Sequence, residues 1–174
     1  YFIFFLYAFS KKRVVVTNSI VPVSVIVCAQ TEEQNLRELV PLLLQQDHPE
    51  FEIIVVEDRS NDNSFEYLLE ESKKNPRLRI VRVDHKPEHV NGKKYGLTLG
   101  IRAANYEWVL FTDADCRPSG NHWITEMVRG IEDSTQFVLS FSAYNKLPGF
   151  LNSFIRFETL LTGIQYIAYA LLGK

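Results

Sequence analysis

The pattern of hydrophobic and polar residues along the chain predicts strands and helices in alternation. Two continuous apolar runs of strand length, at residues 23–29 (VSVIVCA) and 51–57 (FEIIVVE), are rich in Val and Ile. Such runs are typical of strands that are buried on both faces of a parallel sheet. Residues 77–83 alternate charged and apolar side chains, which indicates a half-exposed edge strand, and residues 107–112 form a further apolar run.

The segments between these runs have helical spacing. Apolar residues recur three or four positions apart in residues 31–46, at Leu36, Leu39, Val40, Leu43 and Leu44, and in residues 62–74, at Phe65, Leu68 and Leu69. Asn61 or Asp62 can cap the second of these helices. Two further helices are expected at residues 92–104 and 119–131, the latter capped by Ser119.

Strands that alternate with helices are the signature of βαβ units, so the predicted fold class is α/β, a mostly parallel sheet flanked by helices. Right-handed crossovers place every strand-to-helix loop along one edge of such a sheet. The polar loops after Ala29, Glu57, Val83 and Thr112 are therefore expected to converge. Ligands bind at this edge in open α/β sheets.

The last part of the chain has a different character. Residues 137–141 are a candidate further strand, and an apolar stripe then recurs at helical spacing, at Phe150, Phe154, Phe157, Leu161, Ile164 and Leu171. A helix this apolar is either packed deeply or lies against a membrane surface. Residues 148–174 are accordingly interpreted as an apolar helix that leads into a further C-terminal part.

The first part of the chain is also apolar. Residues 1–9 (YFIFFLYAF) are followed at once by Lys11, Lys12 and Arg13. One interpretation is the end of a transmembrane helix with its basic residues on the cytoplasmic side, and the other is a buried strand or helix end. The expected organisation is a juxtamembrane segment at 1–13, a ligand-binding domain at 21–142 and the helix at 148–174, within a fragment of a longer protein.

Composition excludes some classes of protein. The 174 residues are 46% hydrophobic and 23% charged, with a formal net charge of -2. This balance is that of a folded domain, and it lacks the basic excess of a nucleic-acid-binding protein. Cys28 and Cys116 lie far apart in sequence, which argues against a disulfide framework and for a reducing compartment.

The strongest local candidate for chemistry is Asp113-Ala114-Asp115, directly after a predicted strand. Strand alternation puts both carboxylates on one side of the chain. Two hard oxygen ligands suit a divalent cation that keeps water and phosphate as its other ligands. The alternative is that one Asp caps a helix while the other stabilises a turn.

Two other loops carry candidate ligand-binding residues. The carboxylate of Asp58 can accept a hydrogen bond from the imide N–H of uracil, or it can simply stabilise a turn, whereas Asp62 is better placed to cap a helix. Asn91-Gly92-Lys93-Lys94 precedes a helix, whose N-terminus favours anions, so a lysine there can reach a phosphate. A solvated lysine pair is the alternative.

Four segments in order resemble the family 2 glycosyltransferases: VSVIVCAQTEEQNL, VEDRSNDNS, NGKKYGLTLGI and FTDADCRP. The resemblance implies the glycosyltransferase A fold, with a Rossmann-like sheet, and inverting, metal-dependent transfer from a nucleotide-sugar donor, with UDP as the expected nucleotide. The acceptor would be a saccharide or a lipid-linked molecule. The resemblance is strongest to bacterial members at the inner membrane whose catalytic domain is cytoplasmic.

The resemblance also implies roles for individual residues. Cys28, Gln30 and Glu32 fall in the loop that lines the base pocket, although the frequent P-A-Y-N-E pattern is absent there. Asp58 matches the aspartate that contacts uracil, and Lys93 falls near the diphosphate. Asp113 matches the first D-x-D carboxylate, near the ribose and a Mn²⁺ or Mg²⁺ ion, and Asp115 matches the direct metal ligand.

The resemblance leaves the catalytic base without a candidate. The family places a general base downstream, and its membrane-embedded processive members carry a Q-x-x-R-W motif, which is not found in this sequence. The base is expected beyond Lys174, so this chain is interpreted as a donor-binding fragment. Two alternatives stay open, namely a non-catalytic nucleotide-sugar-binding subunit and a nucleotidyltransferase.

Overall fold

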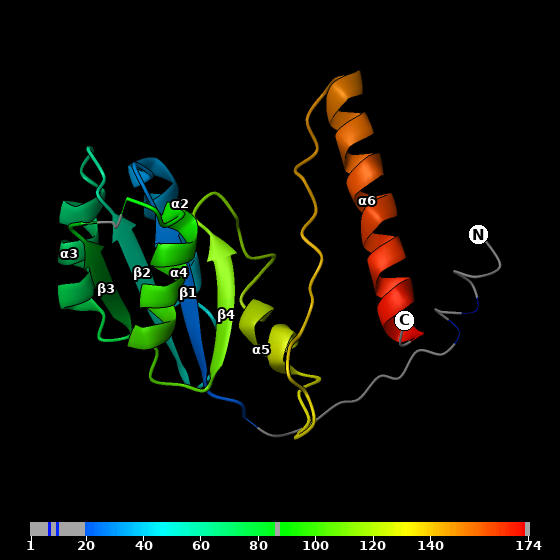
Figure 1. Ribbon diagram of the computed structural model, residues 1–174, viewed down its shortest axis with the longest axis horizontal. Coiled ribbons are helices and arrows are strands. Elements are labelled where there is room, and N and C mark those ends of the chain that lie inside the picture. Colours follow the sequence, from blue (N-terminus) through cyan, green and yellow to red (C-terminus); the bar gives the residue numbers. More distant parts are fainter. Residues whose placement is uncertain (1–6, 8–9, 11–19, 86–87, 173–174) are drawn as a thin grey trace. The chain divides into compact units, whose positions relative to one another are not determined.

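The computed structural model describes residues 7, 10, 20–85 and 88–172. Its elements are, in order, β1 (Val23–Ala29), α2 (Glu33–Leu44), β2 (Phe51–Asp58), α3 (Ser64–Lys74), β3 (Leu78–Val83), α4 (Gly92–Ala103), β4 (Trp108–Asp113), α5 (Trp123–Val128) and α6 (Phe150–Leu171) (Figure 1). The chain divides into two compact units, one of which is Asn18–Arg129 and contains the sheet. The proposed segment at 1–13 lies outside the described residues, except for Tyr7 and Ser10.

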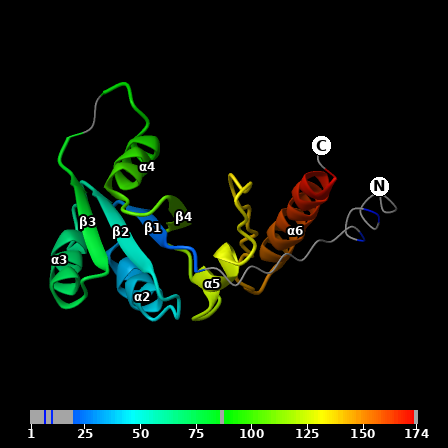
Figure 2. The same ribbon diagram turned by 90° about the horizontal axis from the view of Figure 1, so that it is seen from below.

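The sheet has four parallel strands in the order β3-β2-β1-β4, which confirms the predicted α/β class. The helices α2 and α3 lie on one face, and α4 lies on the other (Figure 2). The chain fills the sheet from β1 to β3 in one direction and then returns to add β4 on the other side of β1. This reversal of direction between β1 and β4 is a topological switch point, the usual location of a ligand site in an open α/β sheet.

Burial explains why the two central strands form where the sequence predicts them. In β1, Val25, Ile26 and Val27 are fully buried, as are Ile53 and Ile54 in β2. β-Branched side chains pack well on a pleated surface that is covered on both faces. The predicted strand bounds differ from the observed ones by at most one residue.

A glycine permits close packing of α4 on the sheet. A Cβ atom built on Gly100 would lie 2.6 Å from Cγ2 of Ile26 and 3.2 Å from Cγ2 of Val56. The first distance is too short for a Cβ atom and the second is tight, so α4 approaches the sheet with its backbone. Gly96, about one helical turn earlier, faces Cys28 and Val56, so the first half of α4 lies beside the carboxyl ends of β1 and β2.

Two predictions for local structure are wrong in detail. Leu69 is exposed, and the buried residues of α3 are Ser64, Tyr67 and Leu68, so the buried face is shifted by one residue from the predicted Phe65, Leu68 and Leu69. Helix α5 is shorter than the predicted range of 119–131, and residues 119–122 bend instead. The reason is that the side chain of Gln46 hydrogen-bonds to the carbonyl of Gly120 at 2.9 Å and to the backbone N–H of Ile124 at 3.1 Å, which fixes a non-helical entry.

The candidate strand at residues 137–141 is absent. Residues 136–147 have no regular secondary structure, and none of them pairs with the sheet in the described part of the chain. These residues belong to the other compact unit, which includes Gly130–Lys174. In that unit α6 forms as the apolar spacing predicts, and Phe141 contacts the helix at Gly163. No helix in the described part of the chain is both long enough and apolar enough to cross a bilayer.

A buried carboxylate joins the amino ends of three neighbouring segments. Glu52 is 6% exposed. Its oxygens accept hydrogen bonds from Oγ of Ser24 at 2.7 Å, from Nη1 of Arg79 at 2.7 Å, and from the backbone and side-chain nitrogens of Asn105 at 2.7 and 2.9 Å. These hydrogen bonds compensate for the burial of the charge. Removal of the carboxylate would leave its donors without an acceptor, which would lower the stability of the fold.

We expect Glu52→Gln to lower the free energy of unfolding by about 2 kcal/mol, because the amide presents donors to groups that are themselves donors. Burial alone would raise the pKa of Glu52, but the hydrogen bonds from Ser24, Asn105 and Arg79 outweigh it and leave the pKa below its ordinary value of 4.5. The stabilisation is therefore present above about pH 4.5 and is lost as the pH falls further. Urea unfolding between pH 7 and pH 3 measures both effects.

Glu107→Gln is the matched control, since Glu107 is exposed. Its unfolding free energy should equal that of the wild type across the same pH range. Equal stability of Glu52→Gln and Glu107→Gln at pH 7 would show that the cluster contributes nothing.

Candidate functional site

The carboxyl ends of β1, β2 and β4 bring the predicted site residues together at the switch point. In the register of the sheet, Cys28 lies between Val56 of β2 and Asp113 of β4. Asp58 is the last residue of β2, and Asp113 is the last residue of β4. The loops that follow these strands therefore start within one or two strand spacings of each other, as the parallel topology predicts.

The start of α4 adds a cation to this edge. The side-chain oxygen of Asn91 caps the helix, accepting from the backbone N–H groups of Lys93 at 3.1 Å and Lys94 at 3.4 Å. Nζ of Lys93 forms an ion pair with Oδ1 of Asp113 at 2.8 Å. The hydrogen bond and charge of Asp113 raise the pKa of Lys93, and the charge of Asp115 adds to this effect. Lys93 thus lies within electrostatic range of both D-x-D carboxylates.

Cys28 lies within electrostatic range of the same charged residues. The pKa of its thiol is raised to about 11, mainly by burial and also by the charges of Asp113 and Asp58, while the charge of Lys93 lowers it. At neutral pH the thiol is protonated, so Cys28 is a packing residue rather than a nucleophile. Asp58, Lys93 and Asp113 all act on this one side chain, although they come from three different segments.

The D-A-D segment forms a tight turn. The backbone N–H of Cys116 donates to the carbonyl of Asp113 at 3.1 Å, Ala114 is buried, and Asp113 and Asp115 are exposed. Among the described residues, no three His, Cys, Asp or Glu side chains gather as a set of metal ligands. The turn therefore offers two exposed carboxylates as candidate metal ligands.

The loops after β1 and β2 are fastened to each other. The backbone N–H of Thr31 donates to Oγ of Ser60 at 2.9 Å, and the N–H of Ser60 donates to Oε1 of the buried Glu57 at 2.5 Å. Thr31 and Arg59 both have left-handed backbone conformations, with φ of 59° and 54°. This conformation is disfavoured for a β-branched residue such as Thr31, so the surrounding hydrogen bonds hold the loop in place.

Asp58 and Asp62 have different surroundings. The side chain of Asp58 is 14% exposed and pairs with Nε of Arg59 at 2.7 Å. The carboxylate of Asp62 accepts from the backbone N–H of Glu33 at 3.0 Å and of Ser64 at 3.1 Å, so it caps the starts of both α2 and α3. The predicted capping role of Asp62 is confirmed.

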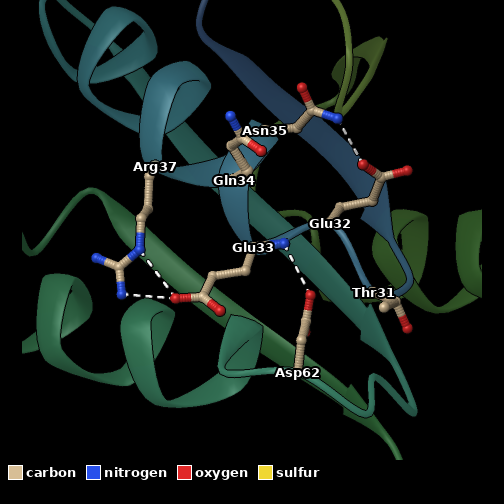
Figure 3. A pocket seen from close by; sticks show the side chains of 7 residues that line it. All are labelled: Thr31, Glu32, Glu33, Gln34, Asn35, Arg37 and Asp62. Carbon is tan, nitrogen blue, oxygen red and sulfur yellow. Dashed lines mark hydrogen bonds and ion pairs between the residues drawn. The ribbon is translucent and has the colours of Figure 1, made fainter.

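A hollow of about 460 Å³ lies at the start of α2. Figure 3 shows its lining, which comprises Thr31, Glu32, Glu33, Gln34, Asn35, Arg37 and Asp62. Of the residues predicted to bind a nucleotide, only Glu32 lines it. The other predicted residues do not line this hollow. Four of them lie at the switch point, namely Cys28, Asp58, Lys93 and Asp113, and Gln30 is exposed on the loop between β1 and α2.

Two residues that shape this edge were not predicted from the sequence. Ser60 joins the first two loops, and Arg117 contacts the D-A-D turn and α2. Both are polar residues just after a candidate ligand-binding residue. Position in sequence was the only available signal, because the partners that connect them to other segments, Thr31, Asn35 and Glu38, lie between 29 and 82 residues away.

Comparison with known proteins agrees with this arrangement. The model of glycosyl transferase family 2 matches residues 24–169. The poly-beta-1,6-N-acetyl-D-glucosamine synthase of Staphylococcus epidermidis is 34% identical over 94 residues, which are 53% of this chain and 21% of the synthase. The chain spans less than half the length of the curated relatives it matches, 41% in one case and 21% in the synthase.

Two solved structures share the fold. The mannosyltransferase PcManGT from Pyrobaculum calidifontis, in complex with GDP-Man and Mn²⁺, has a TM-score of 0.61 at 22% identity and covers 77% of this chain and 40% of its own. Residues 1–349 of S. aureus TarS, in complex with UDP-GlcNAc, have a TM-score of 0.52 at 26% identity, covering 60% and 29%.

The sheet and these likenesses place the chain in the glycosyltransferase A class of α/β proteins. The chain belongs to glycosyl transferase family 2, since the family model covers residues 24–169 of its 174 residues. The resemblance seen in the four sequence segments is thereby confirmed.

Proposed function

We propose that the protein containing this chain transfers a sugar from a UDP-linked donor to an acceptor hydroxyl, and that residues 21–142 bind the donor. The observation that carries the proposal is the geometry of the switch point, where Asp113 lies beside Cys28 in the sheet, Nζ of Lys93 pairs with Asp113 at 2.8 Å, and Asp58 ends the neighbouring strand β2. The choice of UDP is supported by TarS, which forms a complex with UDP-GlcNAc. It is supported further by the polymer named for the staphylococcal synthase, which consists of N-acetylglucosamine.

Each segment of the site has a role in this proposal. Asp58 accepts the imide N–H of uracil, and the loop with Cys28, Gln30 and Glu32 borders the base. Lys93 holds the diphosphate as a point charge at the start of α4, where the helix N-terminus also favours anions. Arg59, which pairs with Asp58 at 2.7 Å, must leave that carboxylate or share it when the base binds.

The D-A-D turn fits a Mn²⁺ or Mg²⁺ ion. Asp113 and Asp115 are exposed hard oxygen donors in one turn, and such ions are commonly held by one or two carboxylates with phosphate and water as the remaining ligands. A bound ion would act as a Lewis acid that spreads the negative charge developing on the leaving diphosphate. Through such an ion the two carboxylates would hold the diphosphate near Lys93, which contacts Asp113 at 2.8 Å.

Transfer with inversion and an acceptor that is a saccharide or a lipid-linked molecule are proposed from the family resemblance. We assign donor binding to these residues and a general base to none of them. The proposed chemistry of this chain is therefore selection of the nucleotide and orientation of the diphosphate. Both can be measured as binding, without turnover.

A first experiment tests the D-A-D turn by calorimetry of UDP with and without Mn²⁺. We expect Mn²⁺ to tighten UDP binding by at least about tenfold, a difference of about 1.4 kcal/mol, and Asp115→Ala to abolish this gain while the circular dichroism spectrum stays unchanged. Asp133→Ala, at an exposed carboxylate in another turn, is the control and should behave as the wild type. Equal UDP affinity of the wild type with and without Mn²⁺ would refute the metal assignment.

A second experiment tests the base pocket by comparing UDP with CDP. Cytosine lacks the imide N–H, so the wild type should bind UDP at least about tenfold more tightly, as expected for one hydrogen bond to a charged group. Asp58→Ala should bring the two affinities together by weakening UDP alone. Asp84→Ala, which removes an exposed carboxylate beyond β3, should retain the preference. An unchanged preference in Asp58→Ala would remove the assignment of Asp58.

Membrane association at the bacterial inner membrane, with the donor site in the cytoplasm, is a further part of the proposal. Its support is the apolar surface of α6, where Phe150 is 85% exposed and stacks on Phe154 with ring centroids 6.2 Å apart. Charged residues are sparse on this helix, with Arg156 and Glu158 the two that it carries. An exposed apolar surface of this kind suits the headgroup–acyl boundary of a bilayer.

Flotation with phosphatidylglycerol vesicles tests this role of α6. The chain should float with the vesicles, and the double substitution Phe150→Ser, Phe154→Ser should reduce the bound fraction by at least about tenfold, since each buried Phe contributes about 1.5–3 kcal/mol at full burial. Phe111→Ser, at an exposed Phe of β4, is the control. Equal flotation of both variants would exclude this role of the helix.

A further inference from the structure

Arg117 lies directly after the D-A-D turn and holds the backbone of that turn. Its side chain is 26% exposed. Nη1 donates to the carbonyl oxygen of Ala114 at 3.0 Å and to that of Cys116 at 2.8 Å. These carbonyls belong to the peptide group that precedes Asp115 and to the one that follows Cys116, so one guanidinium group holds the backbone at both ends of the Asp115-Cys116 pair.

The other side of the same guanidinium is anchored on α2. Nη2 donates to Oδ1 of Asn35 at 2.9 Å and to Oε2 of Glu38 at 2.8 Å, and Nε donates to the same Glu38 oxygen at 3.2 Å. The amide of Asn35 in turn donates to Oε2 of Glu32 at 2.6 Å. A continuous set of hydrogen bonds therefore runs from the loop after β1 to the acidic turn after β4.

These hydrogen bonds restrict the positions of the carboxylates of Asp113 and Asp115. The turn is closed by the hydrogen bond from Cys116 N to the carbonyl of Asp113 at 3.1 Å, and the buried Ala114 fixes its inner side. With the carbonyl of Ala114 directed at Arg117, the orientation of Asp115 relative to Asp113 is set by the backbone. Two carboxylates can bind the same cation only if the backbone places them at a suitable distance and orientation relative to each other.

Only arginine can make this set of contacts. Its planar fork presents five N–H donors in fixed directions, which here serve two carbonyls, one amide oxygen and one carboxylate. A lysine has three donors on one flexible atom, so it cannot hold both sides of the turn.

We propose that Arg117 is a positioning residue for the divalent cation, acting through the backbone of the turn that carries Asp113 and Asp115. Its anchors are Asn35 and Glu38, and through Asn35 the metal-binding turn is linked to Glu32 in the base loop. This inference rests on the proposed function. Arg117 touches neither the cation nor the nucleotide.

The test uses Mn²⁺ as the probe, with free Mn²⁺ followed by electron paramagnetic resonance at saturating UDP. Arg117→Lys and Arg117→Met should weaken Mn²⁺ binding by about tenfold or more, as is common when a group that orients metal ligands is lost. UDP affinity in EDTA should stay at the wild-type value, because the base loop keeps its own hydrogen bonds. Arg129→Met, at an exposed arginine of the same unit that pairs with Glu126, is the matched control.

Glu38→Gln keeps the inference testable if Arg117→Met does not fold. Glu38 is exposed and contacts Arg117 from outside, so this variant should fold normally and weaken Mn²⁺ binding by a smaller factor, about threefold, because Arg117 then has one anchor fewer. In Arg117→Lys, Glu38→Gln should add little further loss, since the two residues act as one unit.

The outcomes separate the inference from the proposed function. If the wild type shows no Mn²⁺-dependent UDP binding, the proposed function fails. If the wild type shows it and Arg117→Lys binds Mn²⁺ as tightly as the Arg129→Met control does, the positioning role is overturned. An equal loss of Mn²⁺ binding and of UDP affinity in EDTA, with a lowered melting temperature, would mark Arg117 as a general structural residue and would also overturn it.

Discussion

The pairing of β1 with two parallel neighbours is the constraint on which the rest of the structure depends. Hydrogen bonds on both sides fix Cys28 opposite Val56 and Asp113, and a slip of one residue on either side would turn the alternating side chains to the wrong face. The fully buried apolar residues of β1 make such a slip costly. The positions of Asp58 and Asp113 at the rim are consequences of this register, since each ends its strand.

The parts that follow from this constraint are the parts that the sequence predicted well. The apolar runs of β1 and β2 leave no ambiguity, because a strand buried on both faces needs nearly every residue to be apolar. Parallel topology then brings the loops to one edge. For this reason the sequence alone could predict that Asp58 and Lys93, which are distant in sequence, belong to one site. The prediction of the site residues therefore depended on the predicted topology more than on any single motif.

The features that the sequence did not predict depend on partners distant in the chain. The bend before α5 is fixed by Gln46, 78 residues from Ile124, and the anchors of Arg117 on α2 lie 79 and 82 residues before it. Local periodicity carries no information about such contacts, because it reports only which face of an element is apolar. The candidate strand at 137–141 fails for a related reason, since a strand exists only where a neighbour pairs with it.

The charges at the switch point connect the metal and donor proposals. Asp58, Asp113 and Asp115 would repel a diphosphate if they stood alone, and Lys93 is shared with Asp113 at 2.8 Å. One lysine cannot neutralise two carboxylates and a diphosphate together. In the proposed function, a divalent cation between the turn and the diphosphate would offset this repulsion, because it is attracted to both groups at short distance. The acidic turn would therefore favour the diphosphate of a donor only together with a cation.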